Sequence, residues 1–243
     1  MRVLAASDLH YALPQFDWLV ARAINYDMVV LAGDLLDLSS TVEPDVQILV
    51  ITKYLREISQ RTVLAVCSGN HDGDVRVDTG EFAAEWLREI HANDLYIDGD
   101  TFLLGPDRVS ICPWWETDVS RARMVEKLRA DAALEPHGRR WIWVHHSPPD
   151  QCPVSWNGKA YAGDPFLNNL IRELHPDIVF SGHIHNAPFY ADGAWVANLD
   201  GTWVFNGGCQ IGRIPSFITL DLDTLEARYR NLEETDTRSL TPA

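Results

Sequence analysis

The sequence predicts a single α/β domain in which two β-sheets pack together and helices lie outside both sheets. Short apolar runs alternate with segments of helical periodicity through the first half of the chain, and only strand-like runs follow residue 194. No linker, repeat or low-complexity stretch interrupts the 243 residues, so residues 1–243 are expected to form one domain.

The first part of the chain predicts strand–helix–strand repetition. Buried strands are expected at 2–7, 28–33 and 62–67. Apolar residues at helical spacing predict helices at 15–25 and 44–59, and Pro44 suits a first helical turn. This alternation favours parallel strands joined by right-handed crossovers.

The remaining elements are shorter. Helices are predicted at 81–91 and 117–134, and short antiparallel strands at 95–97, 101–104 and 109–111. A strand at 141–145, a helix at 165–174 and a strand at 178–181 follow. The last strands, at 194–197, 203–205, 217–222 and 227–231, predict a β meander. The polar segment 233–243 is expected to fray.

Composition excludes several classes of protein. A hydrophobic fraction of 46% and an aromatic fraction of 10% exclude intrinsic disorder. The net charge is 20 − 35 = −15, which repels nucleic acids and anionic membranes at long range and makes a nucleic-acid partner an unfavourable hypothesis. An anionic substrate would need a local source of positive charge at its binding site, and a bound metal ion is the obvious one.

Localisation is expected to be cytoplasmic, with no membrane partner. The four cysteines show no CxxC spacing, which favours reduced thiols. The N-terminal MRVLAASDLHY lacks the apolar region of a signal peptide, and no apolar run approaches the ~18 residues needed to span a bilayer.

Six of the nine histidines follow predicted strands inside short polar clusters. These clusters are Ser7-Asp8-Leu9-His10, Gly33-Asp34-Leu35-Leu36-Asp37, Gly69-Asn70-His71-Asp72, His145-His146-Ser147-Pro148 and Gly182-His183-Ile184-His185, one of which lacks histidine. Ligands bind beyond the carboxyl ends of strands in open α/β sheets, so all five clusters are expected to meet at one site. Burying so many Asp and His side chains without partners would cost several kcal/mol each, which favours a metal site over a structural role.

The residue types suit two metal ions rather than one. Asp8 and His10 point to one face of an extended segment, and the carboxylate of Asp34 can bridge two ions about 3.5–4 Å apart. Neutral ligands are available from Asn70, His146, His183 and His185. Two divalent ions bring +4 and two carboxylates return −2, so the centre stays positive and attracts phosphate.

In this order the DxH, GDxxD, GNHD, HxP-type and GHxH motifs resemble the calcineurin-like metallophosphoesterase superfamily. The resemblance runs from residue 8 to residue 185, about three-quarters of the chain. It implies a four-layer αββα sandwich of two mixed β-sheets with helices on both outer faces. It also implies a dinuclear metal site at one edge, formed by two divalent ions such as Mn, Fe or Zn.

The resemblance implies two ligand sets that share one aspartate. The first metal would be held by Asp8, His10, Asp34 and His185. The second metal would be held by Asp34, Asn70, His146 and His183. His71 would be the catalytic histidine beside the metals, and Asp37 its carboxylate partner.

Two of these assignments have alternatives. Family members usually place the histidine ligand two residues before a proline, which favours His146 with Pro148 and leaves His145 as a packed neighbour. Asp72 is an alternative partner for His71, or else a turn residue beside Gly73.

The function implied is hydrolysis of a small-molecule phosphomonoester or phosphodiester by a metal-bridging hydroxide, with His71 assisting the leaving group. Leu38 stands where related protein Ser/Thr phosphatases carry a phosphate-binding arginine. Asp37 stands where purple acid phosphatases carry a tyrosine ligand. These departures favour the broad bacterial-type phosphatases and phosphodiesterases.

Other features have two interpretations each. Trp114, Trp115 and Trp156 favour packing, with a stacking wall for a flat leaving group as the alternative. The Asn206-Gly207-Gly208 loop is expected to approach the site. A rival function is a non-catalytic scaffold that binds a partner protein through the Trp-rich surface, but such a scaffold would be expected to lose ligands that this chain retains.

Overall fold

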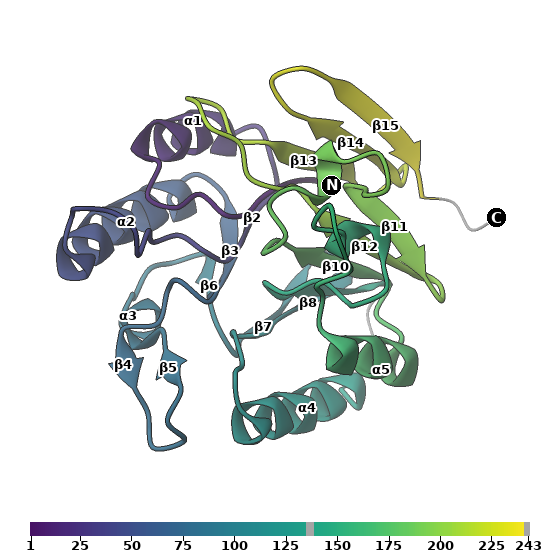
Figure 1. Ribbon diagram of the computed structural model, residues 1–243, viewed down its shortest axis with the longest axis horizontal. Helices are drawn as coiled ribbons and strands as arrows, with labels where there is room; N and C mark the ends of the chain where they lie inside the picture. Colours follow the sequence, from purple (N-terminus) through teal and green to yellow (C-terminus); the bar gives the residue numbers. More distant parts are fainter. Residues whose placement is uncertain (135–138, 241–243) are drawn as a thin grey trace.

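Two mixed β-sheets lie face to face in the computed structural model, which describes residues 1–134 and 139–240 (Figure 1). The first sheet has the order β15-β14-β13-β1-β2-β3-β6. Its strands are β15 (Thr235–Ser239), β14 (Glu226–Arg230), β13 (Phe217–Asp221), β1 (Arg2–Ala6), β2 (Met28–Ala32), β3 (Val63–Cys67) and β6 (Leu95–Tyr96). Strands β1, β2, β3 and β6 run parallel, and β13 joins β1 antiparallel.

The second sheet has the order β11-β12-β10-β9-β8-β7. Its strands are β11 (Val196–Leu199), β12 (Thr202–Asn206), β10 (Ile178–Ser181), β9 (Trp141–Val144), β8 (Asp107–Ile111) and β7 (Thr101–Leu104). The four central strands are parallel and the two edge strands are antiparallel. A separate hairpin is formed by β4 (Val75–Arg76) and β5 (Phe82–Ala83).

Three apolar cores separate four layers. The central core joins the sheets, with Val30 of β2 and Phe180 of β10 among its buried members. A second core lies between the first sheet and helices α1 (Leu13–Ala23), α2 (Pro44–Ser59) and α3 (Glu85–Arg88). A third lies between the second sheet and helices α4 (Asp118–Ala132) and α5 (Pro165–Leu174). The expected αββα sandwich is therefore confirmed, with helices on both outer faces.

Local sequence explains where the helices form. Helix α2 buries Ile51, Leu55 and Ile58, spaced three or four residues apart on one face. Helix α5 begins after Asp164, whose side chain accepts a hydrogen bond from the Phe166 N–H, and begins with a proline at its first position. Two short 3₁₀ turns, Pro153–Ser155 and Ala187–Phe189, complete the helical segments.

The prediction of one helix over 81–91 is wrong. Phe82–Ala83 pair with β4, and only Glu85–Arg88 are α-helical. The reason is that side-chain hydrogen bonds fix residues 81–85 against other parts of the fold. Glu81 accepts hydrogen bonds from the start of α4, and Asp74 accepts the N–H of Glu85. Such side-chain contacts end a helix that apolar spacing alone would extend.

Three further expectations need correction. The 95–97 strand joins the first sheet parallel to β3, because Leu64 pairs with Leu95, rather than pairing with 101–104. The strands after residue 194 divide between both sheets instead of forming one meander. The segment 235–239 does not fray, since β15 pairs with β14 and Leu240 is buried in the central core. Residues 241–243 lie outside the described part of the chain.

No helix among the described residues is long and apolar enough to cross a bilayer.

The arrangement of the two sheets brings the ends of several strands to the same edge of the molecule. The carboxyl ends of β1, β2 and β3 in one sheet, and of β9 and β10 in the other, are each followed by polar segments of the five sequence clusters.

Candidate metal centre

Seven side chains predicted to bind metal lie together at this edge, although they come from five strands. We call them the strand-end cluster: Asp8, His10, Asp34, Asn70, His146, His183 and His185. Each follows a strand by only a few residues, so the two sheets fix the loops that carry them. The expected convergence of the clusters is what the structure shows.

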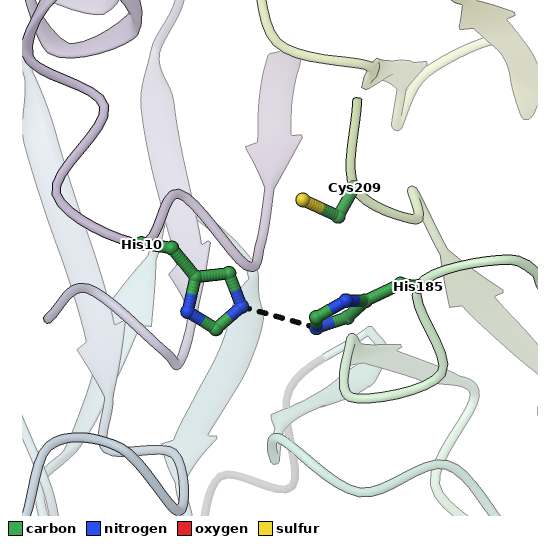
Figure 2. A group of neighbouring side chains, drawn as sticks. All are labelled: His10, His185 and Cys209. Atoms are coloured by element: carbon green, nitrogen blue, oxygen red, sulfur yellow. Dashed lines mark hydrogen bonds between the residues drawn. The ribbon is translucent and has the colours of Figure 1, made fainter. Parts of the chain in front are cut away.

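One half of the cluster contains Asp8, His10, Asp34 and His185. One carboxylate oxygen or imidazole nitrogen from each of these residues lies within 4.8 Å of the others. The Nε2 atoms of His10 and His185 are 3.0 Å apart, and Figure 2 shows the two rings facing each other through these atoms. His185 Nε2 is also 3.3 Å from Asp8 Oδ1. This set of two carboxylates and two imidazoles could hold a divalent ion.

The other half contains Asn70, His146 and His183, and it meets the first half at Asp34. His183 Nδ1 lies 2.9 Å from Asn70 Oδ1, and His146 Nε2 lies 3.3 Å from Asp34 Oδ2. The same Asp34 oxygen is 3.8 Å from His10 Nε2 in the first half. Asp34 therefore lies between two groups of donor atoms.

The backbone of the cluster is strained. Asp8, His10, Asp34 and His183 all have positive φ angles, between 41° and 67°. Each such residue costs on the order of 1–3 kcal/mol and persists only where the surroundings enforce it. Here the loops support one another, because the N–H of Asp8 donates to the Gly33 carbonyl and the N–H of His10 donates to the Asp34 carbonyl.

Two glycines allow the loops to approach this closely. A Cβ at Gly33 would collide with the ring of His146, and a Cβ at Gly69 would collide with the carboxylate of Asp34. Gly33 also has a φ of 84°, which side chains disfavour. The glycines that precede Asp34 and Asn70 thus have a steric function.

Unpaired buried atoms indicate that the cluster fits a metal centre. Within the described residues, Asp8 Oδ2 and His146 Nε2 are buried and have no hydrogen-bond partner. The Nδ1–H of His146 donates to the Ala32 carbonyl at 2.7 Å, so in the neutral ring the lone pair is on Nε2. An imidazole fixed by a backbone carbonyl at one nitrogen, with the other facing carboxylates, is the usual arrangement of a metal ligand.

The electrostatics of the cluster are dominated by close opposite charges. Burial disfavours the charged form of Asp34, yet the neighbouring His146 and His71 hold the pKa of Asp34 well below its usual range. Burial also opposes protonation of His146, but the charges of Asp34 and Asp8 raise the pKa of His146 to about 9. Burial and the charge of His146 lower the pKa of His183 to about 4.

His71 lies beside the cluster. Its Nε2 atom is 3.9 Å from Asp34 Oδ2, and its ring meets the ring of His10 at 4.7 Å. Its backbone N–H donates to Asp34 Oδ1 at 2.9 Å. The Nδ1 atom has no hydrogen-bond partner among the described side chains and backbone.

Asp37 is not the partner of His71, so that expectation is corrected. Its carboxylate accepts the N–H of Ser39, and its backbone is held on both sides by the Gln47 side chain. An aspartate that accepts the backbone N–H two residues on forms an Asx turn, and among the described residues no hydrogen bond joins this carboxylate to the unpartnered Nδ1 atom of His71.

Asp72 joins two of the loops. Its buried carboxylate accepts hydrogen bonds from the N–H groups of Leu35, Leu36 and Gly69. Burial and the charge of Asp34 raise the pKa of Asp72 to about 7, against the effect of these donors. Asp72 thus differs from both roles considered from sequence, since its carboxylate bonds to the loop after β2 as well as to its own turn and makes no hydrogen bond to the Nδ1 atom of His71.

We predict that Asp72→Ala destabilises the protein by about 3 kcal/mol, because three buried N–H groups lose their acceptor. Asp74→Ala is the matched control, since Asp74 is exposed and its side chain accepts hydrogen bonds at the start of α3, where a lost cap costs about 1 kcal/mol. Urea unfolding of both variants with a chelator present measures the difference without metal binding. Equal unfolding midpoints would show that Asp72 does not join the loops in this way.

The two neighbouring histidines that follow β9 have different surroundings. His146 points toward Asp34, whereas His145 stacks on Trp115 at 3.9 Å and lies 3.4 Å from the Cys112 carbonyl. Burial lowers the pKa of His145 to about 4. The contacts place His146 within the cluster and His145 behind it.

The tryptophans also differ. Trp115 is buried, stacks on His145 and donates to Asp164. Trp156 meets Tyr161 edge to face. Trp114 is half-buried, and its ring lies 5.2 Å from the ring of His183. Trp114 alone of the three is found beside the strand-end cluster.

Sequence reasoning missed Cys209. Its sulfur and one nitrogen from each of His10 and His185 lie within 4.8 Å of one another, so the three could hold an ion between them (Figure 2). The loop starting at Asn206 was expected to approach the site, and it does, because Cys209 N–H donates to the His185 carbonyl. Cys209 directly follows the Asn206-Gly207-Gly208 loop, and this position in the sequence could have indicated that the cysteine lies near the site.

The αββα sandwich and its edge cluster are those of a metal-binding phosphoesterase class. A model of the calcineurin-like phosphoesterase family matches residues 1–187, well over half of the chain. The protein belongs to this family, and membership supports a hydrolase that acts on phosphoesters. The resemblance carried by the five motifs is thereby confirmed.

Solved structures share the fold at low identity. The protein TT1561 of Thermus thermophilus is 18% identical with a TM-score of 0.60, and the match covers 99% of both chains. A dimetal phosphatase from Danio rerio is 12% identical with a TM-score of 0.55, again over 99% of both. Purple acid phosphatase PPD1 from yellow lupin is 14% identical with a TM-score of 0.59, and 51% of that chain is covered. No curated protein matches.

Proposed function

We propose that this protein is a dinuclear metal-dependent phosphoesterase that hydrolyses a small-molecule phosphomonoester or phosphodiester. The observation that carries the proposal is the position of Asp34 between two groups of donor atoms, 3.3 Å from His146 Nε2 and 3.8 Å from His10 Nε2. A carboxylate that adjoins two groups of donors suits two ions rather than one.

The proposed ligands follow the two halves of the cluster. Asp8, His10 and His185 would hold one ion, Asn70, His146 and His183 the other, and Asp34 both. When bound, two divalent ions supply Lewis acidity toward phosphoryl oxygens and lower the pKa of a coordinated water. The positive centre also offsets the negative charge of the whole chain, so an anionic ester is attracted locally.

His71 is proposed to assist the leaving group. Its ring lies against His10 and Asp34, with part of its side chain open to solvent. A protonated imidazole in this position can donate its proton to a departing alkoxide, which is otherwise a poor leaving group.

Removal of metal should abolish the activity reversibly. We expect the protein reconstituted with Mn, Fe or Zn to hydrolyse 4-nitrophenyl phosphate or bis(4-nitrophenyl) phosphate. The rate should fall by more than about 100-fold after dialysis against a chelator, because the Lewis acid contributes several kcal/mol. Restoring the metal should restore the rate.

The same assay separates the catalytic proposal from its rival. A faster rate with one of the two esters assigns the monoesterase or diesterase class. Inertness toward both esters at full metal loading would contradict the proposal and favour a non-catalytic scaffold on the same fold. Activity that survives complete metal removal would contradict it as well.

A further inference from the structure

A cavity of about 330 Å³ adjoins the strand-end cluster. It lies between the β4–β5 hairpin and α4, which Figure 1 shows facing each other at the lower edge of the molecule. Gly69, which precedes Asn70, and Trp114, whose ring lies 5.2 Å from that of His183, line both the cavity and the cluster. A group leaving an ester held at the cluster would therefore have this cavity beside it.

Apolar side chains line two facing sides of the cavity. Trp114 and Met124 line the side toward α4, and Val77 and Phe82 line the side toward the hairpin. Phe82 is 53% exposed, so its ring is accessible to a ligand in the cavity. Two apolar surfaces facing each other suit a flat ring.

The hairpin wall is fixed by Glu81. Its carboxylate accepts hydrogen bonds from the Ser120 hydroxyl at 2.6 Å and from the N–H groups of Glu116 and Thr117. The Thr79 hydroxyl donates to its other oxygen. Because Glu81 is buried and fully occupied, it holds the hairpin against α4 and is not available to a ligand.

Charged side chains also line the cavity, and most of them have partners within the described residues. Arg88 pairs with Glu85, Lys127 pairs with Asp131, and Asp98 accepts the N–H of Ser68. Arg123 differs from these, because it is exposed and makes no hydrogen bond or ion pair with any residue in the described ranges. The cavity therefore presents one uncompensated guanidinium in a protein whose net charge is −15.

We propose that this cavity receives the leaving group of the substrate and selects a flat ring that carries a negative charge. The inference rests on the proposed function. The ring lies between the Trp114 and Phe82 walls, and Arg123 pairs with the anionic substituent. A free arginine at the rim is suited to this, since its planar guanidinium matches a carboxylate or phosphate.

The test compares two aryl monoesters, phenyl phosphate and 4-carboxyphenyl phosphate, by kcat/KM. Arg123→Ala should lower kcat/KM for the carboxylated ester about threefold to fivefold, the upper part of the range for an exposed ion pair, and should lower it less for phenyl phosphate, which lacks the carboxylate. Arg123→Glu should lower kcat/KM for the carboxylated ester further, because the new carboxylate repels the carboxylate of the substrate. Arg129→Ala is the matched control, because Arg129 lies on the same helix but pairs with Glu173 away from the cavity.

The ring-binding wall is tested separately with Phe82→Ala. This variant should lower kcat/KM for both aryl esters while the metal content stays at the wild-type value. Equal rates for wild type, Arg123→Glu and Phe82→Ala with both esters would overturn the cavity assignment and leave the proposed function standing.

Inertness of the metal-loaded wild type toward both of these monoesters and toward the diester bis(4-nitrophenyl) phosphate would instead contradict the proposed function. The cavity is then judged by calorimetric binding of 4-hydroxybenzoate, the product of the carboxylated ester. Binding that Arg123→Glu weakens at least threefold supports the cavity assignment. Binding that this variant leaves unchanged, or no binding to wild type, overturns it.

Discussion

His71→Ala is expected to lower kcat by about 10²- to 10⁴-fold, the usual contribution of a general acid, while the protein keeps its full metal content. His71 lies 3.9 Å from Asp34 through Nε2, but it is outside the two groups of donor atoms that meet at Asp34. Turnover and metal content by mass spectrometry are measured on the same preparation.

The leaving group provides the internal control for His71. A 4-nitrophenyl ester needs little protonation as it departs, so the loss in kcat should be much smaller with it than with an alkyl ester. Loss of metal in His71→Ala would show that His71 is a ligand. An equal loss of kcat with both esters would exclude its role as proton donor.

Asp34→Asn is expected to lower the affinity for both ions together, each by at least about 10- to 100-fold, as loss of a carboxylate that serves two ions requires. The amide can still accept the His71 N–H through one oxygen, so the loop geometry is preserved. It loses the negative charge and the second oxygen, which faces His146 and His10. Titration with Mn²⁺ followed by calorimetry measures both affinities.

Asp37→Asn is the matched control for metal binding. Asp37 belongs to the same GDxxD motif, but within the described ranges its carboxylate accepts only the Ser39 N–H, an acceptor role that an asparagine oxygen can take over. Its two metal affinities should equal those of wild type. If Asp34→Asn lost only one of the two ions, this would contradict the proposal that Asp34 is a ligand of both.

Much of the site could be predicted because its residues follow buried parallel strands. Apolar runs located β1, β2, β3, β9 and β10, and the carboxyl ends of such strands share an edge. Asp8, Asn70 and His183 therefore come together although they are far apart in the chain. The motif order then added a family that the match over residues 1–187 confirms.

The parts that could not be predicted depend on side-chain contacts between distant segments. The helix expected at 81–91 is interrupted because Glu81 bonds to the start of α4, about 35 residues later. Asp72 and Asp37 have equivalent carboxylates, and only the fold decides that one joins two loops while the other closes its own turn. Cys209 approaches His185 through a loop whose path sequence periodicity does not specify.

An anomalous difference map from crystals grown with ample Mn²⁺ tests the dinuclear centre most directly. We predict two peaks about 3.5–4 Å apart at the Asp34 carboxylate, with His10 and His185 beside one and His146 and His183 beside the other. A single peak at the cluster, or no peak under saturating metal, would contradict it.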